Sequence, residues 1–303
     1  MNSRKIQVSN RLLRCTVVCC LLLFVSSCEI KEEVQALGLE VTYIDKTTSG
    51  YFNLDESIQL KTTVTGSQFS TFYVLLTYLN NLNVAQTIYL KDESNSGKEL
   101  NLSTLDEIKQ YTGEKTIEFH LPPNLKKGEP WSLSVFLKDE TGSQTRELSG
   151  RIVSEWLNVH LQADANAFFS SATGNVLSPI VAMNNPDGID ITYGAGGSLN
   201  LNPTLMSYQQ RSAEGLGPIP SKAASCRFVL SSSTISDFQS TTKPWKTLVE
   251  SYVILATTPE KVLIKQFEMY GFQNLEGKKG LIYVNQIIEG EDGYVSISVK
   301  AEK

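Results

Sequence analysis

Few side chains in this sequence have the types and spacing that catalysis requires. The 303 residues include two histidines, His120 and His160, and each lies in a run whose alternation is typical of a β-strand. We interpret both as strand residues rather than general bases. The sequence contains no His-Glu-x-x-His, Cys-x-x-Cys, Gly-x-Ser-x-Gly or phosphate-binding Gly-Lys-Ser/Thr motif. It therefore predicts no zinc enzyme, no nucleophilic triad beside a motif, and no enzyme of a recognisable class.

Hard-oxygen ligands of the kind that calcium prefers come together at one point in the sequence. Asn185, Asp187 and Asp190 lie close to one another, and Gly188 permits a tight bend between them. The spacing is not that of an EF-hand, because the glutamate that ends such a loop is missing. Segments rich in Asn, Asp, Pro and Gly are typical of turns. We therefore interpret this segment as a turn and predict no metal or other cofactor.

The carboxylates and aromatic rings allow two further functions, glycoside hydrolysis and glycan binding. A glycosidase needs two carboxyl groups about 5 Å or about 6.5–9.5 Å apart across a cleft, and a sequence does not reveal that spacing. Glycan binding needs less, namely an aromatic ring that faces the solvent. The candidate ligand-binding residues are Trp131, Trp156, Trp245 and Tyr208. Trp245 also fits a packing role, because it lies on an apolar stripe with helical spacing.

Composition and charge exclude several classes of protein. Hydrophobic residues make up 41% of the chain and charged residues 19%, which excludes a disordered, collagen-like or polytopic membrane protein. Residues 1–27 hold four of the 27 basic residues and none of the 32 acidic ones, so the remainder has 23 positive and 32 negative charges, a net charge of −9. Such a surface repels phosphate backbones, and we predict no nucleic-acid partner.

The N-terminus has the features of a secretory signal. Four basic residues precede an uncharged apolar run from Cys15 to Val25. A helix of that length reaches about 16 Å, roughly half of a hydrocarbon core, which favours a signal peptide over a membrane span. Ser26 and Ser27 follow, and then Cys28.

This segment resembles the lipobox of bacterial lipoproteins. The resemblance implies a signal peptide over residues 1–27, lipidation of Cys28, a tether over 28–36 and anchoring in the outer membrane through the lipid. Lys31, Glu32 and Glu33 resemble the export tag that sends lipoproteins of glycan-degrading gut bacteria to the cell surface. A charge run beside a terminus is also typical of a solvated tether, so the external and the periplasmic face both stay open.

Cysteine usage predicts that packed cores, rather than disulfides, stabilise the mature chain. Cys15, Cys19 and Cys20 would leave with the signal, and Cys28 would carry the lipid. Only Cys226 remains, so no disulfide can form within one mature chain. Because Cys226 lies in a strand-like run, we predict a buried, inert thiol.

Residues 37–153 show period-two alternation of apolar and polar residues, in about seven or eight runs separated by turn residues. This spacing predicts an antiparallel β-sandwich. The clearest hairpin begins with the strand 131–139. The loop 122–130 and this last hairpin resemble immunoglobulin-like modules of bacterial surface proteins. Residues 107–111 also fit a short helical turn.

The pattern resets near Trp156, which predicts a second, mostly β domain over 154–303 with one or two helices. An apolar stripe from Trp245 to Tyr252 predicts a helix opened by a proline. For 258–270 the pattern fits either a second helix or a buried strand.

Two further segments of this domain have distinct patterns. Residues 194–217 contain few strong helix or strand formers, and we expect an irregular excursion there in which Tyr208 could line a groove. A final hairpin joins 280–289 to 294–300. The domain resembles a C-terminal module of uncharacterised surface lipoproteins from glycan-degrading gut bacteria, in patterns that match Phe168–Gly174, Ile189–Tyr193 and Lys278–Lys300 here.

The sequence thus predicts a mainly β, non-enzymatic protein held at the outer membrane by its lipid. The sandwich would hold the second domain away from the bilayer, and that domain would bind glycan or another surface component. Two alternatives stay open: a polysaccharide hydrolase that uses two carboxylates, and a structural or adhesin-like subunit whose edge strands pair with a partner.

Overall fold

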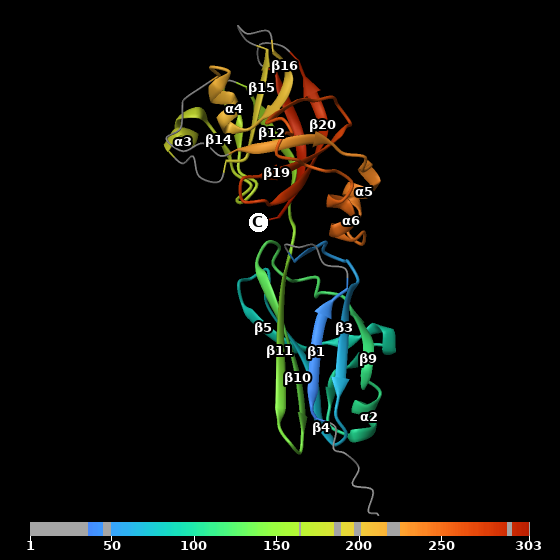
Figure 1. Cartoon of the computed structure of the whole chain (residues 1–303). Helices are drawn as coiled ribbons and strands as arrows, with labels where there is room; N and C mark the ends of the chain where they lie inside the picture. The colour runs from blue at the N-terminus through green and yellow to red at the C-terminus, as the bar shows by residue number, and fades with distance from the viewer. Residues whose placement is uncertain are drawn as a thin grey trace, which may run out of the picture.

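The computed structural model describes residues 36–44, 50–163, 165–184, 189–196, 201–216, 225–289 and 293–302. The fold is mainly β, which confirms the predicted class, and Figure 1 shows two β-rich bodies that follow one another along a long axis. The predicted lipidation residue Cys28 and the predicted tag Lys31, Glu32 and Glu33 lie outside the described residues. Among the described residues, no helix has the length and apolar character needed to cross a bilayer.

The N-terminal body is a sandwich of two sheets, antiparallel except for the parallel pairing of β2 with β11. The smaller sheet has the order β1 (Gly38–Tyr43), β3 (Ile58–Thr65) and β9 (Gly113–Phe119). The larger sheet has the order β2 (Tyr51–Phe52), β11 (Ser143–Ile152), β10 (Pro130–Asp139), β4 (Phe69–Leu79) and β5 (Ala85–Tyr89), and β8 (Asn101–Leu102) also pairs with β4. The predicted hairpin after Trp131 is the β10–β11 pair. Smaller elements of this body are β6 (Lys91–Asp92), η1 (Glu93–Asn95), β7 (Lys98–Glu99) and α2 (Leu105–Lys109), the last close to the predicted helical turn.

Alternation along the strands builds the core of the sandwich. One face of β4 carries Phe72, Val74 and Leu76, and all three side chains are buried. β10 lies beside it in register and buries its own inward face in the same way, from Trp131 to Leu137. Inward-facing residues from both sheets therefore meet in one hydrophobic cluster.

The C-terminal body has two five-stranded sheets around a second core. One sheet has the order β12 (Ser154–Gln162), β21 (Tyr294–Ala301), β20 (Lys279–Ile288), β19 (Met269–Asn274) and β17 (Cys226–Leu230). The other has the order β14 (Val176–Leu177), β13 (Phe168–Phe169), β15 (Ile191–Gly196), β16 (Leu201–Met206) and β18 (Lys261–Leu263). The β20–β21 pair is the predicted final hairpin. Side chains from both sheets form one cluster.

Four short helices occur in the described part of this body, where one or two were predicted: α3 (Pro179–Asn184), α4 (Tyr208–Ala213), α5 (Ile235–Gln239) and α6 (Trp245–Val249). The helix expected after Pro244 is α6, and it buries Trp245, Leu248 and Val249. The second helix considered for 258–270 is wrong. The run instead forms β18, which pairs with β16, but this strand is not buried as the alternative expected, since Leu263 is 62% exposed.

The irregular excursion expected over 194–217 is also wrong in its described part. This stretch contains β16 and α4, and Ser207 between them caps α4 by accepting a hydrogen bond from the Gln210 backbone N–H at 3.0 Å. Pairing with β15 and β18 stabilises β16 although its own sequence favours a strand only weakly.

Candidate functional site

Three of the four predicted ligand-binding aromatic residues lie inside the protein. Trp245 and Tyr208 are 0% exposed, and Trp131 is 1% exposed. Trp131 packs against the Phe52 ring with 5.6 Å between centroids, in the core of the sandwich. A ring closed off from solvent offers no face to a glycan, so the prediction that these three residues bind one is wrong.

Trp156 is the only one of the four that is half-buried rather than buried. Its indole meets the Phe169 ring edge-on, at 5.7 Å between centroids. It also covers Gly174, whose φ of +77° lies in the left-handed region. A Cβ at Gly174 would collide with the indole, so this glycine leaves the space that the ring occupies.

The remaining sequence candidates do not come together. The His120 side chain is exposed and pairs with Glu93 at 3.4 Å, whereas His160 lies against Tyr294 in the other body. Cys226 is 0% exposed, and burial raises the pKa of its thiol, as expected of an inert cysteine. No group of three metal-ligating side chains occurs among the described residues.

Asp190, the one described member of the predicted calcium site, is buried and already bonded to protein groups. Its carboxylate accepts hydrogen bonds from the Ser171 backbone N–H and hydroxyl, and from the Asn274 amide at 3.3 Å. Burial raises the pKa of this carboxyl. The other two candidate ligands, Asn185 and Asp187, lie outside the described residues.

The two bodies are fastened by polar bonds across their junction. The Glu56 carboxylate, 2% exposed, accepts hydrogen bonds from the backbone N–H groups of Asn53 at 2.7 Å and Trp245 at 2.9 Å. The Asn53 amide donates to the Lys243 carbonyl at 2.6 Å, and the Asp55 N–H donates to the Thr241 carbonyl at 3.0 Å. The N-terminal sandwich therefore supplies an acceptor for the first backbone N–H of α6, which has no acceptor within the helix.

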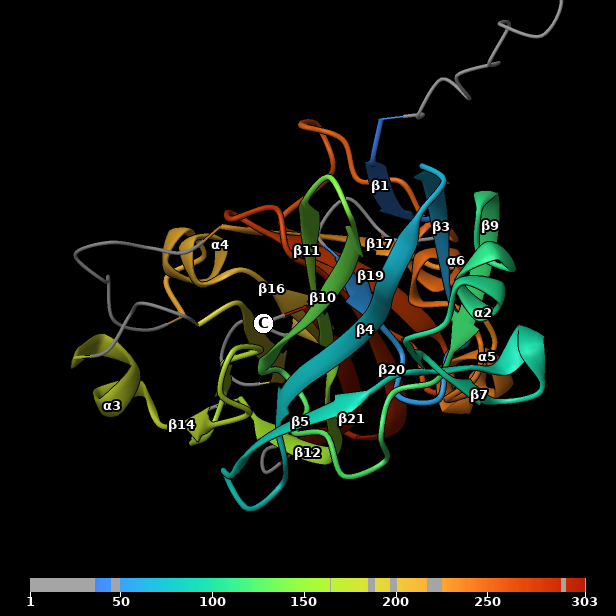
Figure 2. The same ribbon diagram turned by 90° about the horizontal axis from the view of Figure 1, so that it is seen from below.

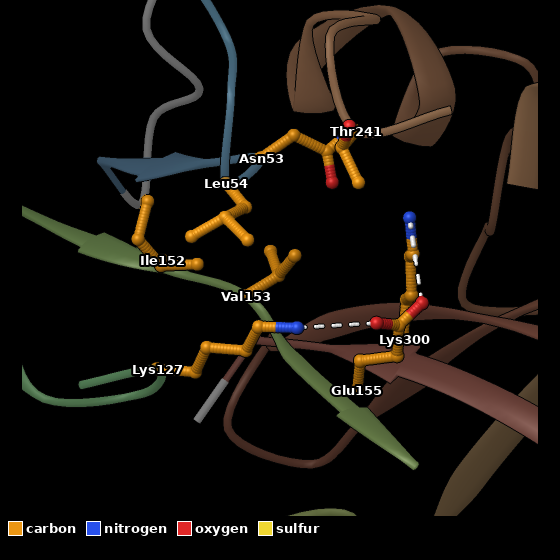
Figure 3. A pocket seen from close by; sticks show the side chains of 8 residues that line it. All are labelled: Asn53, Leu54, Lys127, Ile152, Val153, Glu155, Thr241 and Lys300. Atoms are coloured by element: carbon orange, nitrogen blue, oxygen red, sulfur yellow. Dashed lines mark hydrogen bonds and ion pairs between the residues drawn. The ribbon is translucent and has the colours of Figure 1, made fainter. Parts of the chain in front are cut away.

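A small, partly open hollow lies at this junction (Figure 3). Glu155 accepts from Lys127 at 3.2 Å and forms an ion pair with Lys300 at 3.7 Å, so it links the two bodies. The Lys300 side chain is 3% exposed, and burial lowers its pKa while Glu155 opposes that change. Lys300 also donates to the Ser240 carbonyl at 3.2 Å. Because its charged groups already bond to one another, we assign the hollow a structural role.

A second, larger feature lies on the larger sheet of the sandwich. Between Lys61 and Lys91 the sequence has 29 residues, and none of them is charged. They form β4, β5 and the loop between them, together with the end of β3. Figure 2 shows β11, β10 and β4 side by side, with β5 beyond β4 at the margin of the sheet. With 19% charged residues in the whole chain, an uncharged run of this length indicates a surface where charge would interfere.

The outer face of this sheet carries aromatic side chains. Tyr73 and Phe136 stack with 4.7 Å between centroids, and Tyr89 meets Tyr73 edge-on at 6.2 Å. Tyr89 is 39% exposed, and the other two are half-buried. Two hydroxyl groups lie on the same face: those of Thr77 and Thr87 are 3.2 Å apart.

The margin of the sheet is apolar as well. β5 pairs with β4 on one side, and no described strand pairs with its other side. Four large apolar side chains are exposed within eight residues of chain: Leu82 at 80%, Val84 at 50%, Ile88 at 40% and Tyr89 at 39%. We call β5, its preceding loop from Leu82 and the aromatic cluster the uncharged edge.

The sequence also indicates this site, through apolar residues at strand positions that face outward. In β4, Tyr73 and Leu75 interrupt the inward-facing set, and Phe136 does the same in β10. A strand with apolar residues at both parities has two faces to cover, and a sandwich covers only one of them. Together with the lack of charge, this pattern indicates a contact surface.

No protein-family model matches this sequence, and no curated protein matches it either.

Proposed function

We propose that this chain is a lipid-anchored, non-enzymatic protein of the outer membrane that binds another polypeptide through its uncharged edge. It acts as an adhesin-like or structural subunit rather than through a pocket in the C-terminal body. The observation that carries the proposal is the uncharged strand β5, whose outer side pairs with no described strand and which lies among exposed apolar side chains. An open strand edge recognises extended polypeptide through backbone hydrogen bonds.

The anchoring half of the proposal rests on the N-terminal sequence and on where the described chain starts. The lipobox-like segment ends at Cys28, a short distance before Gly38. β1 starts at the end of the sandwich that lies away from the C-terminal body (Figure 1). A lipid at Cys28 would therefore hold the sandwich next to the membrane and the C-terminal body farther out. Three acyl chains on one cysteine suffice for stable anchoring.

Metabolic labelling with a radioactive fatty acid tests the anchor. The wild-type chain is expected to carry label and to sediment with outer membranes. The Cys28→Ser variant is expected to lose both properties, while Cys226→Ser is expected to keep both because its thiol is buried. Equal labelling of wild type and Cys28→Ser would overturn the anchoring proposal.

Photo-crosslinking in intact cells tests the binding surface. A photoreactive residue at Thr87 on β5 is expected to yield a discrete adduct with another polypeptide. The matched control is Thr116 on β9, which is also an exposed threonine on a marginal strand. Glu114 and Lys115 lie beside Thr116, and Asp92 and Ser94 bond to this strand, so its edge is charged and covered. No adduct at Thr87, or equal adducts at both positions, would contradict the proposal.

Glycan binding is a second candidate, supported by the aromatic cluster on the outer face. Tyr73 and Phe136 occupy each other's faces, so Tyr89 offers the most accessible ring. If this function holds, Tyr89→Ala will lower the retardation of the protein in polysaccharide-containing native gels, and Trp245→Phe will leave it unchanged. Equal migration of wild type and Tyr89→Ala on every polysaccharide would exclude this use of the cluster.

A further inference from the structure

The backbone of β5 has a regular set of hydrogen-bonding groups that point away from the described sheet. The Asn80 N–H donates to the Val84 carbonyl, and the Leu90 N–H donates to the Val74 carbonyl, so at both ends of the hairpin these residues turn their main-chain groups toward the other strand. Such residues alternate along an antiparallel strand with residues whose groups point away. Gln86 and Ile88 therefore bond to β4, whereas the N–H and C=O groups of residues 85, 87 and 89 point away from the sheet.

The close approach of two hydroxyls agrees with this assignment. Thr77 and Thr87 are register partners, and their hydroxyl oxygens lie 3.2 Å apart. Side chains come closer in non-hydrogen-bonded pairs than in hydrogen-bonded ones. Outside the strand ladders, no backbone hydrogen bond described for the chain uses the main-chain groups of Ala85, Thr87 or Tyr89.

Other margins of the described sandwich sheets are protected. Gln144 bonds to β1 from the facing sheet, through the Leu39 N–H at 3.1 Å and the Leu37 carbonyl at 2.6 Å. β2 is two residues long and buried at the junction, and β9 carries charges and bonds to the 92–94 segment. Proteins normally protect strand edges in these ways. The outer edge of β5 lacks such protection among the described residues, and we therefore expect it to bind another strand.

The sequence of β5 is suited to pairing with itself. A two-fold axis at Thr87 would place Thr87 opposite Thr87 of a second copy, and Ala85 opposite Tyr89. These are the residues whose main-chain groups point outward, so the pairing would form about six hydrogen bonds. At a two-fold axis, a charged residue would lie close to the same charged residue of the other copy and be repelled by it. β5 contains no charged residue. The net charge of −9 would oppose contact between two copies at strongly acidic surfaces.

We propose that the occupant of the uncharged edge is a second copy of this chain, joined by antiparallel pairing of β5 with β5. This inference rests on the proposed function, because it names the polypeptide that the edge binds. The two six-stranded sheets would continue as one, and Tyr89 of each copy would cover Ala85 of the other. Antiparallel pairing also reverses one copy relative to the other, so the lipid-bearing ends would point in opposite directions. The contact would therefore join facing membranes.

Sedimentation equilibrium tests the pairing on the mature chain, residues 28–303, with Cys28→Ser so that no lipid is attached. The average mass of the wild type is expected to rise toward that of a dimer between micromolar and millimolar concentration. Thr87→Lys and Thr87→Glu each place like charges opposite each other at the two-fold axis and should weaken self-association about tenfold or more. An equimolar mixture of the two variants should restore it, and Thr116→Lys should match the wild type.

A second variant separates the backbone contact from the side chain. Thr87→Pro removes the outward N–H without removing a ladder bond to β4, and marginal strands tolerate proline at such positions. This variant should keep the wild-type circular dichroism spectrum and lose the dimer. A dimer that survives Thr87→Pro, or a charge mixture that stays monomeric, would overturn the β5 pairing.

The experiments distinguish failure of this inference from failure of the proposed function. A wild-type chain that stays monomeric, combined with a Thr87 adduct in cells that contains a different polypeptide, overturns the self-pairing and leaves the binding edge standing. A monomeric chain with no Thr87 adduct overturns both. Vesicles that carry the chain on a maleimide lipid at Cys28 should cluster, and vesicles that carry the Thr87→Pro variant should not.

Discussion

The Glu56 carboxylate of the N-terminal sandwich accepts a hydrogen bond from the backbone N–H of Trp245, 189 residues later in the chain, at 2.9 Å. Trp245 is the first residue of α6, and no side chain within that helix caps it. The Trp245 indole N–H in turn donates to Glu302 at 3.0 Å, near the C-terminus. One tryptophan thus ties the sandwich, α6 and the end of β21 together. Only a single residue, Val153, connects β11 to β12, so the junction is short as well as bonded.

Glu56→Ala should lower the free energy of unfolding by about 2–4 kcal/mol, because it leaves two buried N–H groups without their acceptor. Urea denaturation followed by circular dichroism measures this change. The control is Glu114→Ala, whose side chain is 66% exposed in an ion pair with Lys61 and should change stability by less than about 0.5 kcal/mol. Equal effects of the two variants would show that Glu56 does not fasten the junction.

Gly174→Ala should destabilise the C-terminal body by about 2–4 kcal/mol, through left-handed strain and a collision with the Trp156 indole. Gly97→Ala separates these causes. Gly97 has a similar φ of +69° but open space where a Cβ would lie, so its variant should show the strain alone, about 1–2 kcal/mol. Thermal denaturation of both variants provides the comparison. The packing argument predicts a clear gap between them, and identical losses would refute it.

Two buried tyrosines should respond in opposite ways to removal of the hydroxyl. The Tyr252 hydroxyl donates to the Gly280 carbonyl at 2.9 Å, so Tyr252→Phe should cost about 1 kcal/mol. The Tyr193 hydroxyl is buried without a hydrogen-bond partner among the described residues, and burial raises its pKa to about 12. Tyr193→Phe should therefore leave stability unchanged or raise it. Urea denaturation of both variants checks the order, and a larger loss for Tyr193→Phe would reverse the argument.

Asp237 should contribute stability that depends on pH. Its hydrogen bond from Lys243 at 2.7 Å, together with bonds from Thr234, lowers its pKa to about 2. Because this pKa is lower in the folded chain than the ordinary 3.8, the contribution is present above pH 3.8 and is lost as pH falls toward 2. Its size is about 0.5–1 kcal/mol, since the pair is partly exposed.

Asp237→Asn provides the measurement for that pH dependence. The difference in unfolding free energy between wild type and variant should be present at pH 6 and should shrink as the pH is lowered from 4 to 2. A difference of constant size over this range would mean that the charge of Asp237 contributes nothing. Thr234 belongs to the same capping box on α5, so Thr234→Ala should lower stability at both ends of the range.

Period-two alternation predicted the main strands and both clear hairpins because it records which residues a sheet buries. The stripe from Trp245 predicted α6 for the same reason, with helical spacing. Where local preference was weak, the prediction failed: β16 forms because β15 and β18 pair with it, and those partners are distant in sequence. The β-branched run at Val262 joined that sheet instead of extending a helix.

The aromatic candidates likewise show what the sequence predicts and what depends on the tertiary structure. Sequence identified the large rings but not their depth, and three of the four proved to be core residues. The uncharged edge was missed although its lack of charge is visible in the sequence, because a strand becomes an edge only through the order of strands in its sheet.

The sequence by itself determined that this chain forms β-strands, and which residues of each strand share a face, because side-chain period and apolar burial are local properties. It also determined the lipobox-like start and the charge of the remainder. The tertiary structure alone decided which of two apolar faces is covered, which strand lies at the margin, and that Glu56 reaches Trp245. Those outcomes depend on pairings between segments far apart in the chain. The contacts that stabilise such pairings form only when the segments are brought together in the folded protein.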